Sequence, residues 1–309
     1  MVNRTLLRIK TVQIVYSFYQ NGGNNISTCE KELLFSIQKS HELYYYLLYL
    51  SVQLTDMAKK RIEAGKNKLL PTYEELHPNT KFIDNRFVAQ LAQNTQLLQY
   101  VDERKIGWDE NFLKTMYNTI TSSELYETYM RKPTSDYDED KDIWKKLYKK
   151  LILNNEDLNV LLEEESLYWN DDIAIVGTFV LKTIKQFDPE NGADQLLQPM
   201  FKDEEDRYYV CRLVRTAIAN GEEFKTWINE HIRNWDFDRI ALMDIVIMQV
   251  ALAELLEFST IPINVTMNEY LEIAKAYSTE KSSTFINGVL DTILIKLKNE
   301  GKLEKIPLA

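Results

Sequence analysis

The chain has 309 residues, of which 45% are hydrophobic and 27% are charged. This composition is typical of a folded globular protein and excludes collagen-like, low-complexity or wholly disordered chains. With only 9 glycines and 7 prolines, long helices are favoured over turn-rich β architecture, so an all-α fold is predicted. The net charge of −10 would repel nucleic acid globally, so any contact with RNA has to be local.

The sequence offers no pattern for catalysis, metal binding or export. Cys29 and Cys211 are far apart, without the spacing of a disulfide framework or a zinc site, and the three histidines have no metal-ligand spacing. Glycine-rich nucleotide loops, G-x-S-x-G and H-E-x-x-H are absent, so we expect no enzyme, no cofactor and no metal. The longest charge-free apolar stretch near the start spans 43–55, short of the roughly 20 residues that cross a bilayer. With no signal-peptide pattern, a cytoplasmic location is expected.

The first predicted helix covers 5–20 and carries a local basic arm. The first 29 residues contain no Asp or Glu, whereas Arg4, Arg8 and Lys10 are basic. Arg4 and Arg8 are four residues apart and share a helix face, and cations near a helix N-terminus are not favoured by the helix dipole. A phosphate partner would explain them, and a solvated basic face is the alternative.

Two boundaries are predicted in the middle of the chain. A long helical pattern follows the first helix, and it degrades into charged and turn residues between about 59 and 78. Several helical stretches then recur up to the turn at 188–192. We therefore divide the chain into three parts, which are 1–59, 60–202 and 203–309.

The last part contains three further predicted helices. A helix that is apolar on most sides ends near Phe258, which is typical of a central helix. Thr266 and Glu269 have the spacing of a capping box, so the next helix is predicted to begin near Thr266. In the final helix, over 282–298, Gly288 costs about 1 kcal/mol relative to alanine, so it is expected to permit a close approach of two helices.

The C-terminal stretch resembles the NusB family of bacterial transcription antitermination factors. The matching pieces, in order, are Ala251–Leu255, Ile261-Pro262, Asn268-Glu269 with Glu272–Lys275, and Phe285–Asp291. Val12–Ser17, after the basic arm, resembles the first helix of the family. A typical member is less than half as long, so the resemblance makes 60–202 a helical insertion of unknown role. A second register, in which the helix over 44–62 is the family's third helix, stays open.

The resemblance implies a two-subdomain helical bundle and a non-enzymatic function. Family members pair with the ribosomal protein NusE and bind boxA RNA, so that the RNA polymerase elongation complex reads through ribosomal RNA operons. Two sets of residues follow by position. The RNA contacts are Arg4, Arg8 and Lys10, with Lys281 and Phe285 at a second approach, where Phe285 either stacks on a base or belongs to the core. The contacts with NusE are Tyr16 and Asp244.

This sequence also departs from the family pattern. The arm has fewer arginines than usual, Gln249 stands where an arginine is common, and Ser283-Thr284 replaces a frequent His-Lys. Each lost cation removes a phosphate contact, so RNA binding without NusE is expected to be weak. One alternative is a helical protein–protein scaffold that has lost RNA binding. Another, the NusB-like module of an RNA cytosine methyltransferase, would need a Rossmann-type domain that this sequence does not contain.

Overall fold

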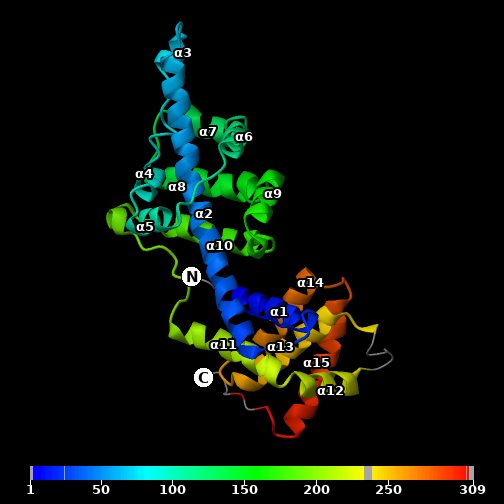
Figure 1. The fold of residues 1–309 in the computed structure, drawn as a ribbon. Coiled ribbons are helices and arrows are strands. Elements are labelled where there is room, and N and C mark those ends of the chain that lie inside the picture. The colour runs from blue at the N-terminus through cyan, green and yellow to red at the C-terminus, as the bar shows by residue number, and fades with distance from the viewer. Residues whose placement is uncertain (1–2, 24, 233–238, 304, 306–309) are drawn as a thin grey trace. The chain divides into compact units, whose positions relative to one another are not determined.

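The computed structural model describes residues 3–23, 25–232, 239–303 and 305. These residues form helices joined by turns and short connections, and no strand occurs among them, so the all-α prediction is confirmed (Figure 1). The chain divides into two compact units. One comprises 38–200, and the other comprises 2–37 together with 201–309. The described part of the chain contains no helix that is both long and apolar enough to cross a membrane.

The unit made of 2–37 and 201–309 is built around one apolar helix. Its helices are α1 (Arg4–Gln20), the start of α2 (Ile26–Lys66), α11 (Glu204–Ala219), α12 (Gly221–His231), α13 (Leu242–Glu257), α14 (Ile263–Tyr277) and α15 (Ser282–Asn299). Every residue of α13 from Asp244 to Leu255 is buried, because the helix contacts α1, α11, α12, α14 and α15. The predicted central helix is therefore confirmed.

The unit formed by 38–200 is a bundle of shorter helices. They are α3 (Tyr73–Leu76), α4 (Arg86–Leu91), α5 (Thr95–Arg104), α6 (Glu110–Thr121), α7 (Glu124–Arg131), α8 (Tyr137–Leu147), the π-helical turn η1 (Tyr148–Ile152), α9 (Glu156–Glu165), α10 (Ile173–Gln186) and the 3₁₀ turns η2 (Leu167–Trp169) and η3 (Pro189–Asp194). The sequence marks where α4 to α9 begin, because at each of these starts an Asn, Asp or Ser side chain accepts a hydrogen bond from the backbone N–H three residues later. These N-caps are Asn85, Asn94, Asp109, Ser123, Asp136 and Asn155.

The first predicted boundary, near 59, lies inside the continuous helix α2. The compact unit begins instead at Gln38 because the tyrosines that follow it are buried among the middle helices. The hydroxyl of Tyr44 hydrogen-bonds that of Thr183 at 2.7 Å, and the hydroxyl of Tyr46 donates to the carbonyl oxygen of Gly107 at 2.8 Å. The second predicted boundary, at 202, lies close to the observed division after Met200.

Two local predictions in the last part of the chain are wrong. α14 begins at Ile263 with Pro262 as its N-cap, so Thr266 lies inside the helix and caps nothing. Gly288 is exposed, and a Cβ atom added there would meet nothing within 4 Å, so this glycine does not permit a close helix contact.

Candidate nucleic-acid interface

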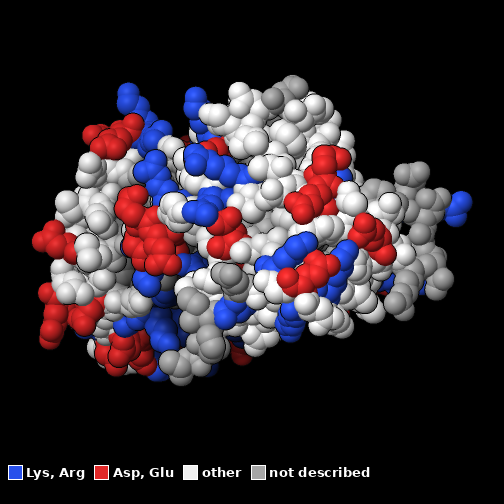
Figure 2. Space-filling model, turned by 90° about the horizontal axis from the view of Figure 1, so that it is seen from below, with Lys and Arg blue, Asp and Glu red and all other residues white. Residues whose placement is uncertain are grey.

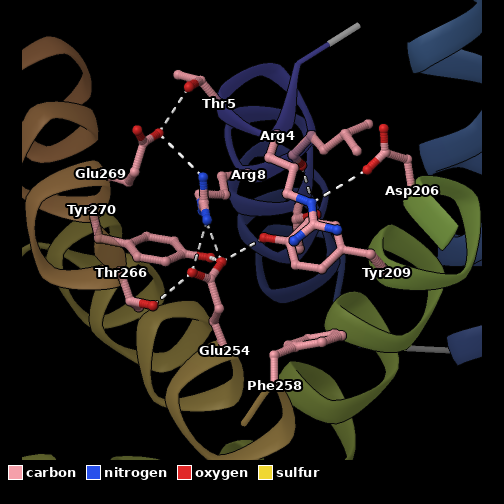
Figure 3. Close-up of polar contacts among 12 residues, drawn as sticks. Arg4, Thr5, Arg8, Asp206, Tyr209, Glu254, Phe258, Thr266, Glu269 and Tyr270 are labelled. Atoms are coloured by element: carbon pink, nitrogen blue, oxygen red, sulfur yellow. Dashed lines mark hydrogen bonds and ion pairs between the residues drawn. The ribbon is translucent and has the colours of Figure 1, made fainter. Parts of the chain in front are cut away.

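Arg8 lies at the centre of a buried polar cluster in which α1, α11, α13 and α14 meet (Figure 3). Its Nε and Nη2 atoms donate to the two carboxylate oxygens of Glu254 at 2.8 and 3.0 Å. The same carboxylate accepts hydrogen bonds from the hydroxyls of Tyr209, Thr266 and Tyr270. Arg8 is 3% exposed and Glu254 is fully buried, so this bidentate pair is part of the core.

The cluster compensates the cost of burying two charges. Burial acts to raise the pKa of Glu254, but the hydrogen bonds and charge of Arg8, with the donors Tyr209 and Thr266, outweigh it and hold that pKa below its ordinary value. Burial and the neighbouring Glu254 carboxylate raise the pKa values of Tyr209 and Tyr270 well above 10, so both hydroxyls stay protonated as donors.

Arg8 therefore belongs to the core of this unit, and its contact with RNA stays a prediction. Glu269 extends the cluster at its edge, because it lies 3.3 Å from the Nη1 atom of Arg8 and accepts a hydrogen bond from Thr5 at 2.8 Å. Lys10 is also buried, at 2% exposure, and its predicted RNA contact likewise stays a prediction. The sequence did not reveal this arrangement because Glu254 lies 246 residues from Arg8, within a largely apolar helix.

Arg4 is also engaged by carboxylates, although it lies nearer the surface. Its Nη2 atom donates to Glu205 at 2.9 Å and its Nε atom donates to Asp206 at 3.2 Å. The guanidinium carbon lies 4.9 Å from the centre of the Tyr209 ring. The side chain is one third exposed, so a phosphate would have to compete with two carboxylates for it. The acid-free arm is thus neutralised by residues from the other end of the chain.

Two other predicted RNA residues, Lys281 and Phe285, do lie together. They line a pocket of about 230 Å³ between the start of α13 and the start of α15. The remaining lining residues are Arg239, Ile240, Ala241, Asp244, Thr279 and Ser282. Lys281 and Arg239 are exposed, Phe285 is half-buried, and neither cation forms an ion pair with a described residue.

Arg239 is a candidate site residue that the sequence reasoning missed. It precedes α13, and Lys281 is the N-cap residue of α15, so both cations lie near helix N-termini. Cations gain nothing from the helix dipole at that end, which was the argument used for Arg4 and Arg8. Arg239 carries the same signal in the sequence, because it too is a cation beside a predicted helix start. The pocket thus brings two cations together near helix N-termini, with the buried carboxylate of Asp244 also in its lining.

Asp244 forms the inner wall of this pocket. One carboxylate oxygen accepts the hydroxyl hydrogen of Ser278 at 2.5 Å, and the other accepts that of Ser282 at 2.9 Å. Asp244 is buried and fixes the turn that carries Lys281, and its contact with a protein partner stays a prediction. Tyr16, the other predicted partner contact, is half-buried on α1, where its hydroxyl accepts a hydrogen bond from Gln20 at 3.0 Å.

Gln249, which stands where the family often has arginine, is also inside the unit. Its amide nitrogen donates to the Tyr19 hydroxyl and to the Ala217 carbonyl oxygen, both at 2.6 Å. A Cβ atom on Gly221 would lie 2.8 Å from that nitrogen, so this corner is closely packed. Gln249 therefore contributes to the packing of this corner.

On the face shown in Figure 2, acidic and basic side chains are intermingled, so the net charge of −10 is not gathered there into one repulsive patch.

Comparisons with known proteins agree with the resemblance read from the sequence. The NusB family matches residues 178–294. The chain is 38% identical to the transcription antitermination protein NusB of Salinibacter ruber over 132 residues, which are 41% of this chain and 82% of that protein. It is 35% identical to that of Geotalea daltonii over 136 residues, 44% of this chain and 91% of that protein. The protein of the same name from Chloroherpeton thalassium is 39% identical over 97 residues, 31% of this chain and 46% of that protein.

No solved structure matches this chain. The relatives from Salinibacter ruber and Geotalea daltonii are each covered over more than four fifths of their length, at identities above 30%. The chain belongs to the NusB family.

Proposed function

We propose that this chain is a non-enzymatic transcription antitermination factor of the bacterial cytoplasm. In this proposal it binds boxA-type RNA of ribosomal RNA operons together with NusE and acts within the RNA polymerase elongation complex. Two relatives covered over most of their length are named transcription antitermination protein NusB, and this similarity is the observation that carries the proposal. The family match over 178–294 places the end of the unit 38–200 in the NusB-like part, together with 201–294. In this proposal, 2–37 belongs to that part too, and the rest of 38–200 is an added helical region.

The pocket between α13 and α15 is the proposed RNA contact. Arg239 and Lys281 would bind backbone phosphates, because both are exposed, without ion pairs to described residues, and next to helix N-termini. Phe285 lines the same pocket with a half-exposed ring, and single-stranded RNA is commonly held by stacking of bases on aromatic side chains. Asp244 would act only by fixing the turn that carries Lys281.

NusE would have to complete the RNA site. Arg4 and Arg8 are already paired with carboxylates, so this chain offers fewer free cations to RNA than its sequence suggests. Fewer phosphate contacts mean lower affinity and a weaker dependence on salt. In this proposal, Tyr16 on the surface of α1 contributes to the contact with NusE.

Fluorescence anisotropy with labelled boxA RNA, with and without NusE, tests this function. We expect tight binding only with NusE, and Arg239→Gln/Lys281→Gln should reduce the slope of log affinity against log salt by about 1.4, or 0.7 per phosphate contact. The control is Lys275→Gln/Lys296→Gln, an exposed and a half-buried lysine of the same unit that are paired with Glu272 and Glu230. Equal losses in both double variants, or no binding to RNA with NusE present, would contradict the proposal.

The alternative of a protein–protein scaffold is favoured by the neutralised arm, in which Arg4 and Arg8 are both held by carboxylates. The same titration separates the two functions. A scaffold would associate with NusE in analytical ultracentrifugation but would add nothing to the affinity of NusE for boxA RNA.

A further inference from the structure

Four lysines form one exposed face of the unit 38–200. They are Lys145, Lys146, Lys149 and Lys150, at the end of α8 and in the π-helical turn η1, and we call them the lysine face. The residues between them, Leu147 and Tyr148, are fully buried, so the helix places its cations in solvent and its apolar side chains in the core. None of these lysines belongs to the pocket proposed above for boxA RNA.

The lysine face is unfavourable for the isolated protein. Lys145 and Lys149 are four residues apart, as are Lys146 and Lys150, and like charges at this spacing destabilise a helix. Lys146 is paired with Asp142 at 2.6 Å, whereas no ion pair joins Lys145, Lys149 or Lys150 to any residue that the structure describes. The helix dipole favours cations near a helix C-terminus, and all four lysines lie there, two in the last turn of α8 and two in η1. The dipole does not remove the repulsion between the lysines of each pair.

The backbone is irregular at the same place. η1 is a π-helical turn, closed by a hydrogen bond from the N–H of Leu153 to the carbonyl oxygen of Tyr148 at 3.0 Å. Single π-helical turns are rare and occur frequently at functional sites. Two like-charged pairs and an irregular turn therefore coincide within 145–152, and an anionic ligand would offset the repulsion.

The surroundings favour an extended anion over a compact one. Lys146 and Lys150 line a cavity of about 320 Å³, but Glu124, Glu139 and Asp142 line it too and would repel a phosphate inside it. The lysine face itself has no exposed apolar side chain that could enter a bilayer or fill a pocket of a protein partner. A chain of phosphates lying across the helix could contact several lysines at once.

We propose that the lysine face binds the sugar–phosphate backbone of single-stranded RNA without sequence preference. Arg and Lys contacts to phosphates fix position and add affinity but carry no sequence information. The unit 38–200 would thus add a non-specific RNA contact of its own. This goes beyond the proposed function, whose boxA contact is assigned to residues of the other unit.

The test uses the full chain and a fluorescein-labelled 30-nucleotide uridine RNA, in anisotropy titrations between about 50 and 200 mM KCl. Lys145→Gln/Lys149→Gln removes two unpaired cations, and glutamine keeps a good helix propensity. We expect the slope of log affinity against log salt to fall by about 1.4 and the affinity at the lowest salt to fall severalfold. The control, Lys60→Gln/Lys66→Gln, changes the net charge equally at two exposed lysines of α2 and should leave the slope unchanged.

Absence of binding by the unaltered chain at the lowest salt, or an equal loss in both double variants, would overturn this inference. Circular dichroism of the variants checks that helix content is kept. Failure of the proposed function is a separate result, since it would appear as binding to uridine RNA with no preference for boxA RNA in the presence of NusE.

Discussion

Two basic segments of this chain, α1 and the lysine face, differ in how far acidic residues pair with their cations. α1 has no acidic residue near it in sequence, yet Arg4 and Arg8 are held by Asp206 and Glu254, more than 200 residues away. The lysine face follows an acidic run over 138–142 and nevertheless stays largely unpaired. The comparison shows that proximity in sequence is a poor guide to which charges neutralise each other.

The acidic run near the lysine face is engaged elsewhere. Asp138 is paired with Lys141, and Glu139 is paired with Lys132. Asp140 is buried and accepts hydrogen bonds from Arg86, Tyr129 and Ser135. Among the described residues, the only ion pair between the run and the lysine face joins Asp142 to Lys146. The folded structure therefore leaves the lysines exposed despite the nearby acidic residues.

The largest expected effect on stability comes from removing the buried partner of Arg8. Glu254→Gln would leave the buried guanidinium of Arg8 with only the partly exposed Glu269 as an anionic neighbour. Removing one partner of a buried ion pair costs about 3–5 kcal/mol, so we expect the free energy of unfolding to fall by about 3 kcal/mol or more in urea titrations. Glu205→Gln, which removes an exposed partner of Arg4, is the control and should cost less than about 1 kcal/mol. Similar losses in the two variants would show that Arg8 is not held in the core.

A smaller loss of stability is expected from a change at the buried carboxylate of Asp140, near the lysine face. Asp140→Asn removes the charge that accepts hydrogen bonds from the Arg86 side chain and the hydroxyls of Tyr129 and Ser135. Leaving such donors poorly matched costs about 1–3 kcal/mol, which urea unfolding would measure. Asp138→Asn, at an exposed position two residues earlier, should change the stability by less than about 0.5 kcal/mol. If both changes are neutral, Asp140 is not committed to the core and could pair with the lysines.

The pH dependence of stability sharpens the first comparison. The fold holds the pKa of Glu254 below its ordinary value, so the unfolded chain binds more protons. The stability from this carboxylate is present above the unfolded pKa of about 4.3 and is lost as pH falls through the folded pKa. Urea titrations between pH 3 and pH 7 should show this loss below about pH 5, with a shallower loss in Glu254→Gln. An equal slope in both proteins would mean that Glu254 titrates normally.

The smallest expected effect concerns the lysine face itself. Lys145→Glu converts a repulsive pair with Lys149 into an attractive one, with the acidic residue nearer the helix N-terminus. Such pairs stabilise a helix by about 0.2–0.5 kcal/mol, so thermal unfolding should show a slight stabilisation while binding to uridine RNA falls. Higher stability with unchanged RNA binding would leave the lysine face as a solvated surface only.

Local signals determined the secondary structure well. The side chains that cap α4 to α9 are Asn, Asp or Ser in the sequence, and each acts within three residues of its own position. The apolar pattern of α13 indicated a central helix because a helix without a polar side can be accommodated only in a core. Lys281 and Phe285 were predicted from the resemblance, and they share a pocket because both lie at the start of α15.

Tertiary contacts decided the rest. Thr266 and Glu269 have the spacing of a capping box, but α14 begins at Pro262-Ile263, and both side chains are directed to the Arg8 cluster instead. Sequence spacing cannot exclude this, since a hydroxyl that can cap a helix can equally donate to a distant carboxylate. The role of Arg8 depended on burial and on a partner far along the chain, and that of the lysine face on exposure. The reason is that distance and solvent exposure in the folded protein, and not separation in sequence, set the strength of a charge interaction.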